Sequence, residues 1–416
     1  MRRRALIAAG MELFVSCSSS NSPTFPQVSQ VPPASIVAGD GSACLLAQGG
    51  VTYCWGSDTG GALGIGSARG AQLLPVAVAG NHTFSSLSGA EFFRCGLSGA
   101  LPLCWGQTLA GGNRGNLYSD SVPTMVALDV PSLATVSAGP SHACGLTKSG
   151  AAYCWGENYF GQLGVGDTLG RSTAVPVSGG IKWSAISVGF WHTCGLTVDS
   201  TAFCWGENLA GELGAPPDSL PLSTTPFAAA RGLKFTSVTT GSLYTCGLTA
   251  AGQIYCWGWN YAGNLGDSTT TNRDTPTPIA QGNVAFKSVV ASNANSIVLV
   301  TCGVTTVNAM YCWGWNGYGQ LGNPNAPSMD CGSVSTNPAS CSSLAPFLVA
   351  GGLQWASVSV GTTHTCGITV TNAAYCWGQN DHGQLGDGST QPSAVPVAVS
   401  GALIAKDRVF IHSASR

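Results

Sequence analysis

A Cys-Trp-Gly tripeptide recurs along the whole chain and constrains the fold more than any other feature. Its tryptophans are Trp55, Trp105, Trp155, Trp205, Trp257, Trp313 and Trp377. The successive steps between them are 50, 50, 50, 52, 56 and 64 residues. A period near 50 residues is typical of a repeat array, in which each unit packs on its neighbours. The 416 residues are therefore expected to form one continuous array rather than separate domains.

Each repeat contains four short strand signals separated by Gly, Pro and Ser turns. In the fourth repeat these signals are Trp183–Gly189, His192–Val198, Ala202–Gly206 and a strand near Pro226–Ala230. Only 8% of the residues are charged and 57 are glycine, which suits sheet faces packed closely between neighbouring units. Seven antiparallel four-stranded units predict an all-β fold, a seven-bladed β-propeller.

Sixteen of the 17 cysteines fall into eight pairs that are close in sequence. The pairs are Cys44/Cys54, Cys95/Cys104, Cys144/Cys154, Cys194/Cys204, Cys246/Cys256, Cys302/Cys312, Cys331/Cys341 and Cys366/Cys376. Regular pairing predicts disulfides and an oxidising compartment, with buried reduced cysteines as the alternative. Cys-x-x-Cys spacing does not occur and the six histidines are scattered, so no metal site is expected.

The second and third strands of each repeat are expected to form a hairpin that brings the paired cysteines together. If Cys194 lies opposite Cys204, then Leu196 faces Ala202 across the hairpin. Directly opposed residues can lie about 4.5–5.5 Å apart, which a disulfide can span. The second repeat has one residue fewer between its cysteines, and a two-residue turn at Gly99-Ala100 keeps its pair opposed.

The first 33 residues are expected to direct and tether the protein. Residues 1–17 resemble a signal peptide with a positive start and a short apolar run. The sequence Phe14-Val15-Ser16-Cys17 resembles a bacterial lipobox, where cleavage leaves Cys17 to be lipidated, and Cys17 is the one cysteine without a partner. Residues 18–33 are rich in Ser and Pro and should form a solvated tether. We expect an outer-membrane or cell-surface lipoprotein that meets the membrane only through this anchor, or alternatively a secreted protein.

The propeller is expected to span residues 34–403. Residues 323–344 form a long polar insertion that contains the Cys331/Cys341 pair. Residues 404–416 are left as a C-terminal tail.

The repeat pattern Cys-Gly-Leu-Thr…Tyr-Cys-Trp-Gly-x-Asn-x-x-Gly-Gln-Leu-Gly resembles the regulator of chromosome condensation repeat. Near-perfect copies of its end occur at Gly161–Gly164, Gly319–Gly322 and Gly383–Gly386. The resemblance covers roughly residues 34–400 and implies a seven-bladed propeller. The namesake promotes nucleotide exchange on a small GTPase and binds chromatin, but an exported chain would not meet those partners. A plant photoreceptor of the family uses Gly-Trp-Arg-His-Thr motifs, and the nearest match, Gly189–Thr193, lacks the Arg.

The chain shows no nucleophile elbow, phosphate-binding loop or run of metal ligands, so neither catalytic residues nor cofactors are predicted. Asp167, Asp267 and Asp387 recur after Leu-Gly and are expected to bond their own turns. Histidines recur before the second strand, with Tyr244 in the fifth repeat, and are expected to form hydrogen bonds between blades. Glu157 and the equivalent Glu207 occupy a position that varies among the repeats, which is typical both of a binding surface and of neutral surface drift.

Aromatic and polar residues in the loops after Cys-Trp-Gly are the candidate binding residues. They are Tyr159, Phe160, Trp259, Tyr261, Trp315, Tyr318 and His382. Propeller symmetry would place these loops around one face, where aromatic rings could anchor a protein or stack on sugars. The alternative is that they pack as caps on the blade edges.

The most favoured function is a non-enzymatic, monomeric binding scaffold that engages a protein partner through these loops. The alternatives are a lectin-like carbohydrate binder and an inhibitor of a secreted or periplasmic enzyme, since a secreted bacterial β-lactamase inhibitor of similar fold binds through aromatic loops. An enzyme is less favoured because no convergent acid/base set is visible. The net charge of −2 offers no basic surface for nucleic acid.

Overall fold

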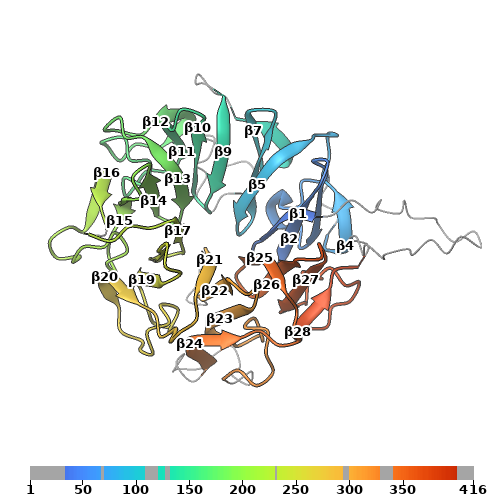
Figure 1. The fold of residues 1–416 in the computed structure, drawn as a ribbon. Coiled ribbons are helices and arrows are strands. Elements are labelled where there is room, and N and C mark those ends of the chain that lie inside the picture. The colour runs from blue at the N-terminus through green and yellow to red at the C-terminus, as the bar shows by residue number, and fades with distance from the viewer. Residues whose placement is uncertain are drawn as a thin grey trace, which may run out of the picture.

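A ring of seven four-stranded antiparallel sheets makes up the computed structural model (Figure 1). The structure describes residues 33–66, 70–107, 120–126, 132–229, 232–293, 299–327 and 341–400. In every blade the strands follow chain order from the axis outward, so β1, β5, β9, β13, β17, β21 and β25 line the centre. The all-β, seven-bladed propeller predicted from the repeats is confirmed.

The first four blades are built from contiguous segments of chain. Blade one contains β1 (Pro33–Ala38), β2 (Ser42–Ala47), β3 (Thr52–Gly56) and β4 (Gln72–Ala77), with the short 3₁₀ helix η1 (Thr59–Gly61). Blade two contains β5 (Phe84–Ala90), β6 (Phe93–Ser98), β7 (Leu101–Gly106) and β8 (Asp120–Met125). Blade three contains β9 (Leu133–Ala138), β10 (His142–Thr147), β11 (Ala152–Gly156) and β12 (Arg171–Pro176). Blade four contains β13 (Trp183–Val188), β14 (His192–Thr197), β15 (Ala202–Glu207) and β16 (Leu222–Ala228).

The last three blades follow the same plan. Blade five contains β17 (Ser237–Thr240), β18 (Tyr244–Leu248), β19 (Ile254–Gly258) and β20 (Arg273–Pro278). Blade six contains β21 (Phe286–Ala291), β22 (Val300–Thr305), β23 (Met310–Trp315) and β24 (Ser342–Leu348). Blade seven contains β25 (Trp355–Val360), β26 (His364–Thr369), β27 (Ala374–Gly378) and β28 (Ser393–Ala398).

The middle hairpin of every blade carries a disulfide. In blade four Cys194 lies opposite Cys204 and Leu196 opposite Ala202, which is the register expected from the spacing. The seven bonds are Cys44–Cys54, Cys95–Cys104, Cys144–Cys154, Cys194–Cys204, Cys246–Cys256, Cys302–Cys312 and Cys366–Cys376. In blade two Ser98 lies opposite Leu101, so Gly99-Ala100 forms the expected two-residue turn. Cys331 lies outside the described residues, and its pairing with Cys341 stays a prediction.

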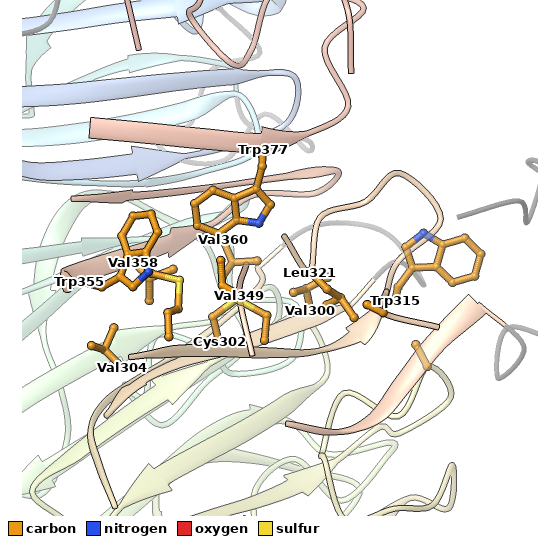
Figure 2. Packing of buried hydrophobic residues seen from close by; sticks show 14 of the residues in the cluster. Val300, Cys302, Val304, Trp315, Leu321, Val349, Trp355, Val358, Val360 and Trp377 are labelled. Atoms are coloured by element: carbon orange, nitrogen blue, oxygen red, sulfur yellow. A yellow bond between two sulfur atoms is a disulfide. The ribbon is translucent and has the colours of Figure 1, made fainter. Parts of the chain in front are cut away.

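The seven Cys-Trp-Gly tryptophans pack between blades and are fully buried, as predicted. Figure 2 shows Trp377 above Val349 and Val360, at the contact of blades six and seven. The Trp377 Nε1–H donates to the Gln320 carbonyl of blade six at 2.9 Å. Equivalent bonds join Trp55, Trp105, Trp205, Trp257 and Trp313 to the preceding blade. Each of these six rings therefore combines apolar packing with one satisfied polar atom, whereas Trp155 Nε1 has no partner among the described residues.

The second glycine of Gly-Gln-Leu-Gly leaves room for the tryptophan of the next blade, which a side chain at this position would contact too closely. Gly164 has a φ of 71°, a conformation that L side chains rarely adopt. A Cβ at Gly164 would lie 2.6 Å from Trp205 Nε1. The repeat motif thus encodes close contact between neighbouring blades.

Side-chain packing closes the ring between the two ends of the described chain. Blades one and seven are each built from four consecutive strands, and no described strand of one blade joins the sheet of the other. The Trp55 Nε1–H donates to the Gln384 carbonyl at 3.0 Å, and the Ala38 N–H donates to Ser359 Oγ at 2.9 Å. Residues of both blades share one apolar cluster, so closure depends on non-covalent contacts.

The outermost strand of every blade contains proline. Six blades place it one residue before the position opposite the second cysteine of the hairpin, at Pro75, Pro123, Pro226, Pro276, Pro346 and Pro396. Proline has no N–H to offer a further strand, so these edges resist pairing with another chain.

Residues 1–32 and 401–416 lie outside the described residues. The signal peptide, lipidation at Cys17, most of the tether, the C-terminal tail and most of the 323–344 insertion therefore stay predictions. Within the described ranges, no helix is long and apolar enough to cross a membrane.

Candidate binding face

The loops that follow Cys-Trp-Gly emerge on one face of the ring. Within a blade, antiparallel order places the loop between the third and fourth strands at the same end as the turn between the first and second strands. The tryptophan bonds join each described loop to the next blade in the same manner. The described loops therefore occupy equivalent positions around the ring.

A recurring set of hydrogen bonds holds the loops that the structure describes. In blade three, Asn158 Oδ1 accepts the Leu163 N–H at 2.9 Å, and Asn158 Nδ2 donates to the Asp167 carbonyl at 2.9 Å. Gln162 Oε1 accepts the Phe160 N–H at 2.9 Å. The Asp167 carboxylate accepts the Leu169 N–H, which confirms its turn role. These polar residues build the scaffold, and Tyr159 at the tip is left facing solvent.

The structure exposes several of the candidate residues. Tyr159 is 71% exposed, Tyr261 is 41% exposed and Tyr318 is 38% exposed. Trp259 is half-buried, and its ring lies 6.1 Å from that of Tyr261. The exposed His382 lies with Nδ1 3.0 Å from Asp381 Oδ1.

Trp315 does not join these rings, which corrects the expectation that its side chain is a candidate binding residue on the face. Its side chain is buried and belongs to the core cluster at the contact of blades six and seven. Here β23 extends one residue beyond Gly314, and Trp315 pairs with Ser342 of β24. Figure 2 shows the indole turned away from Trp377 and Leu321. The indole ring therefore packs beneath the loop and is not exposed on the face.

Trp191 is a surface residue that the loop pattern did not identify. It follows β13, and its ring lies 5.3 Å from Phe160 of blade three and 4.5 Å from the buried Phe190. Leu209, at the tip of the blade-four loop, is 67% exposed. We call Tyr159, Phe160, Trp191 and Leu209 the blade three–four aromatic surface. The one sequence signal for this surface was the Phe-Trp pair before His192. The sequence alone does not show that Trp191 packs against Phe160 of the neighbouring blade.

Three glutamates lie beneath this surface. Glu157, Glu207 and Glu212 are all buried, so Glu157 and Glu207 are not surface contacts at the variable position. Burial raises the pKa of Glu157 to about 7. Burial, followed by repulsion from Glu212, raises the pKa of Glu207 to about 8, and burial raises the pKa of Glu212 to about 7.

Of the recurring histidines, His142 and His192 connect blades as predicted, whereas neither ring nitrogen of His364 has a hydrogen-bond partner. Thr193 Oγ1 donates to the Gln162 carbonyl, so His142 Nε2, 2.7 Å away, donates to Thr193. His192 contacts a threonine in blade five in the same way at 3.0 Å. Burial lowers the pKa of His142 and His192 to about 3, so both are neutral near pH 7. These histidines are structural.

The family model that describes the RCC1-like domain matches residues 104–415. The chain belongs to the RCC1-like domain family. The match covers most of the ring that the structure describes.

Relatives share the repeat at low identity. The ultraviolet-B receptor UVR8 of Arabidopsis thaliana is 27% identical over 387 residues, which are 88% of this chain and 69% of that protein. The human E3 ubiquitin-protein ligase HERC2 is 26% identical over 88% of this chain, but the match spans 6% of the ligase. The crystal structure of Prp20p from Saccharomyces cerevisiae superposes with a TM-score of 0.69 at 17% identity, covering 89% of this chain and 87% of that one. This structural likeness establishes the fold alone.

Proposed function

We propose that this propeller is a non-enzymatic binding scaffold that engages a protein partner through the blade three–four aromatic surface. The observation that carries the proposal is the exposure of Tyr159 and Leu209 on neighbouring loops, beside the partly buried rings of Phe160 and Trp191. Large aromatic side chains that lose their remaining solvent contact are the usual anchors of protein interfaces. Trp259, Tyr261 and Tyr318 would extend the contact around the same face.

The low charge of the chain favours recognition by apolar contact. Only 8% of residues are charged and the net charge is −2, so electrostatic steering of nucleic acid or of a strongly charged partner is weak. The Prp20p structure is described together with binding to Gsp1p and histones. That precedent supports a protein partner for an RCC1-like propeller, although we do not carry over those partners.

An oxidising location agrees with the seven hairpin disulfides, because such bonds persist outside the reducing cytosol. We further propose that the protein is exported and anchored by lipid at Cys17. Labelling with a radioactive fatty acid tests the anchor, and a Cys17→Ser variant that labels equally would contradict it.

Affinity capture from the extracellular and envelope fractions of the source organism tests the binding proposal. We expect wild type to retain a protein partner that the Tyr159→Ala/Trp191→Ala variant loses, with affinity at least about 30-fold lower. Val198→Ala is the matched control, because Val198 is 73% exposed and follows β14 at the opposite end of the blade. Circular dichroism must show that both variants keep the wild-type fold.

Equal retention by all three proteins would refute the role of this surface. A ligand that survives protease digestion of the fraction and appears on a glycan array would establish the carbohydrate binder instead. Capture of an enzyme that loses activity on binding would identify the scaffold as an inhibitor.

A further inference from the structure

Blade four carries an acid at two positions after Cys-Trp-Gly, Glu207 and Glu212, and each of the other blades carries at most one acid at the equivalent positions. The position of Glu207 is occupied elsewhere by Ser57, Gln107, Glu157, Trp259, Trp315 and Gln379. The position of Glu212 is occupied by Ala62, Gln162, Asn264, Gln320 and Gln384 in the other blades whose loops are described. Glu207 is 2% exposed and Glu212 is fully buried.

The contacts of Glu212 show what the second acid changes. Glu212 Oε2 accepts the Ala210 N–H at 2.8 Å, as Gln162 Oε1 accepts the Phe160 N–H in blade three. A glutamine amide therefore suffices to hold the loop. The remaining Glu212 oxygen is buried without a hydrogen-bond partner, and so is one oxygen of Glu207. Glu212 is close enough to raise the pKa of Glu207 by repulsion, so two ionised carboxylates with unpaired buried oxygens would be strongly unfavourable here.

The surroundings supply no positive charge to this pair. The titratable and charged groups on the elements packed against the loop are Glu157, His142, His192, Asp218, Tyr244, Asp274 and Arg273. Both histidines are neutral near pH 7, as described above. The Arg273 guanidinium lies 2.7 Å from the carboxylate of Asp267, so it is already paired. Within the described part of the chain, protonation is the remaining way to keep both acids buried.

The pair is mechanically connected to the aromatic surface. The Glu207 N–H donates to the Trp191 carbonyl at 3.0 Å. Leu209 lies on the short stretch between the two acids. A displacement of this loop would therefore move Leu209 and remove a hydrogen bond from Trp191.

We propose that Glu207 and Glu212 form a proton-controlled latch, which holds the loop of residues 207–212 closed while protonated and releases it when both acids ionise. As a regulator of binding, the latch rests on the proposed function of the same surface. The folded pKa values of about 8 and about 7 place the release near neutral pH. In the open loop both groups would return toward the ordinary value of 4.5.

Hydrogen-exchange mass spectrometry of the free protein between pH 5.5 and 8.5 tests the latch. After correction for the intrinsic exchange rate, opening of the peptide covering residues 207–213 should increase about tenfold per pH unit for each proton released, until the folded pKa is passed. Glu212→Gln should remove about one proton from this dependence, and Glu207→Gln/Glu212→Gln should abolish it. Gln162→Glu is the matched reverse variant, since it pairs Glu157 with a second acid and should add about one proton to the pH dependence of opening in blade three.

A wild-type loop with pH-independent protection would overturn the latch, and so would equal pH dependence in wild type and the double glutamine variant. Glutamine occupies the Glu212 position in three other blades, so Glu212→Gln is expected to fold. The exchange measurement needs no partner. Failure to capture a partner therefore refutes the proposed function, whereas pH-independent exchange refutes the latch.

Discussion

The contact between blades seven and one contains a buried histidine that makes no hydrogen bond. One substitution in blade one should provide the missing hydrogen-bond partner. His364 is fully buried, and neither ring nitrogen has a partner. In blades three and four the equivalent histidine donates to a threonine of the next blade. The position of that threonine in blade one, opposite Trp55, is Ala43. Ala43→Thr should place a hydroxyl beside His364 Nε2 and the Gln384 carbonyl.

The expected gain follows from the missing bonds. A net hydrogen bond contributes about 0.5–1.5 kcal/mol, and an unpaired buried polar group costs about 1–3 kcal/mol. Ala43 is itself fully buried, so the added atoms also cause overpacking, which costs about 1–3 kcal/mol. Ala43→Val adds nearly the same volume without the hydroxyl. Ala43→Thr should therefore be more stable than Ala43→Val by about 1–3 kcal/mol.

Urea unfolding of the two variants and wild type, compared at constant m-value, measures this difference. Thr193→Val is the complementary test, because it leaves His142 Nε2 without its acceptor and should cost about 1–3 kcal/mol. Equal midpoints for Ala43→Thr and Ala43→Val, or a Thr193→Val variant as stable as wild type, would refute the reasoning.

Three further predictions follow from burial. The free energy of unfolding should be greatest between about pH 4.5 and 6.5. Above this range the buried glutamates lose the protons that favour the folded state. Below it the unfolded chain binds protons that His142, His192 and His364 do not bind in the folded state, where their pKa values are about 3. Urea midpoints across pH 3.5–8.5 check this, and a monotonic profile would contradict it. Trp257→Ala should cost about 3–5 kcal/mol because the ring is fully buried, whereas Trp259→Ala at a half-buried ring should cost clearly less; thermal unfolding compares them, and equal losses would count against Trp259 as a surface residue. Reduction of the hairpin disulfides should destabilise the fold by roughly 2–3 kcal/mol for each bond in the chain-entropy model, and a melting temperature unchanged by reductant would be inconsistent with that.

The architecture followed from the sequence because its signals are local. The Cys-Trp-Gly period counts the blades, and the spacing of Cys194 and Cys204 sets the register of a hairpin whose strands are adjacent in the chain. A one-residue deletion in blade two was absorbed by a shorter turn, at Gly99-Ala100. Strand pairing within a blade never requires knowledge of another blade, so pattern and turn chemistry were sufficient.

The proposed binding face depends on contacts between blades, which the sequence does not specify. Trp259 and Trp315 occupy equivalent positions after Cys-Trp-Gly, yet the first is half-buried and the second is buried. Phe160 and Trp191 belong to different blades, and only their packing across the interface creates a surface.

The sequence alone determined the repeat, the blade register and the residues that must be buried in every blade, because these are set by neighbours along the chain. The tertiary structure decided which loop side chains reach solvent, which acids are paired beneath them and how the two ends of the ring meet. Exposure and pKa depend on all the atoms within a few ångströms, and around the ring most of those atoms come from residues about 50 or more positions away.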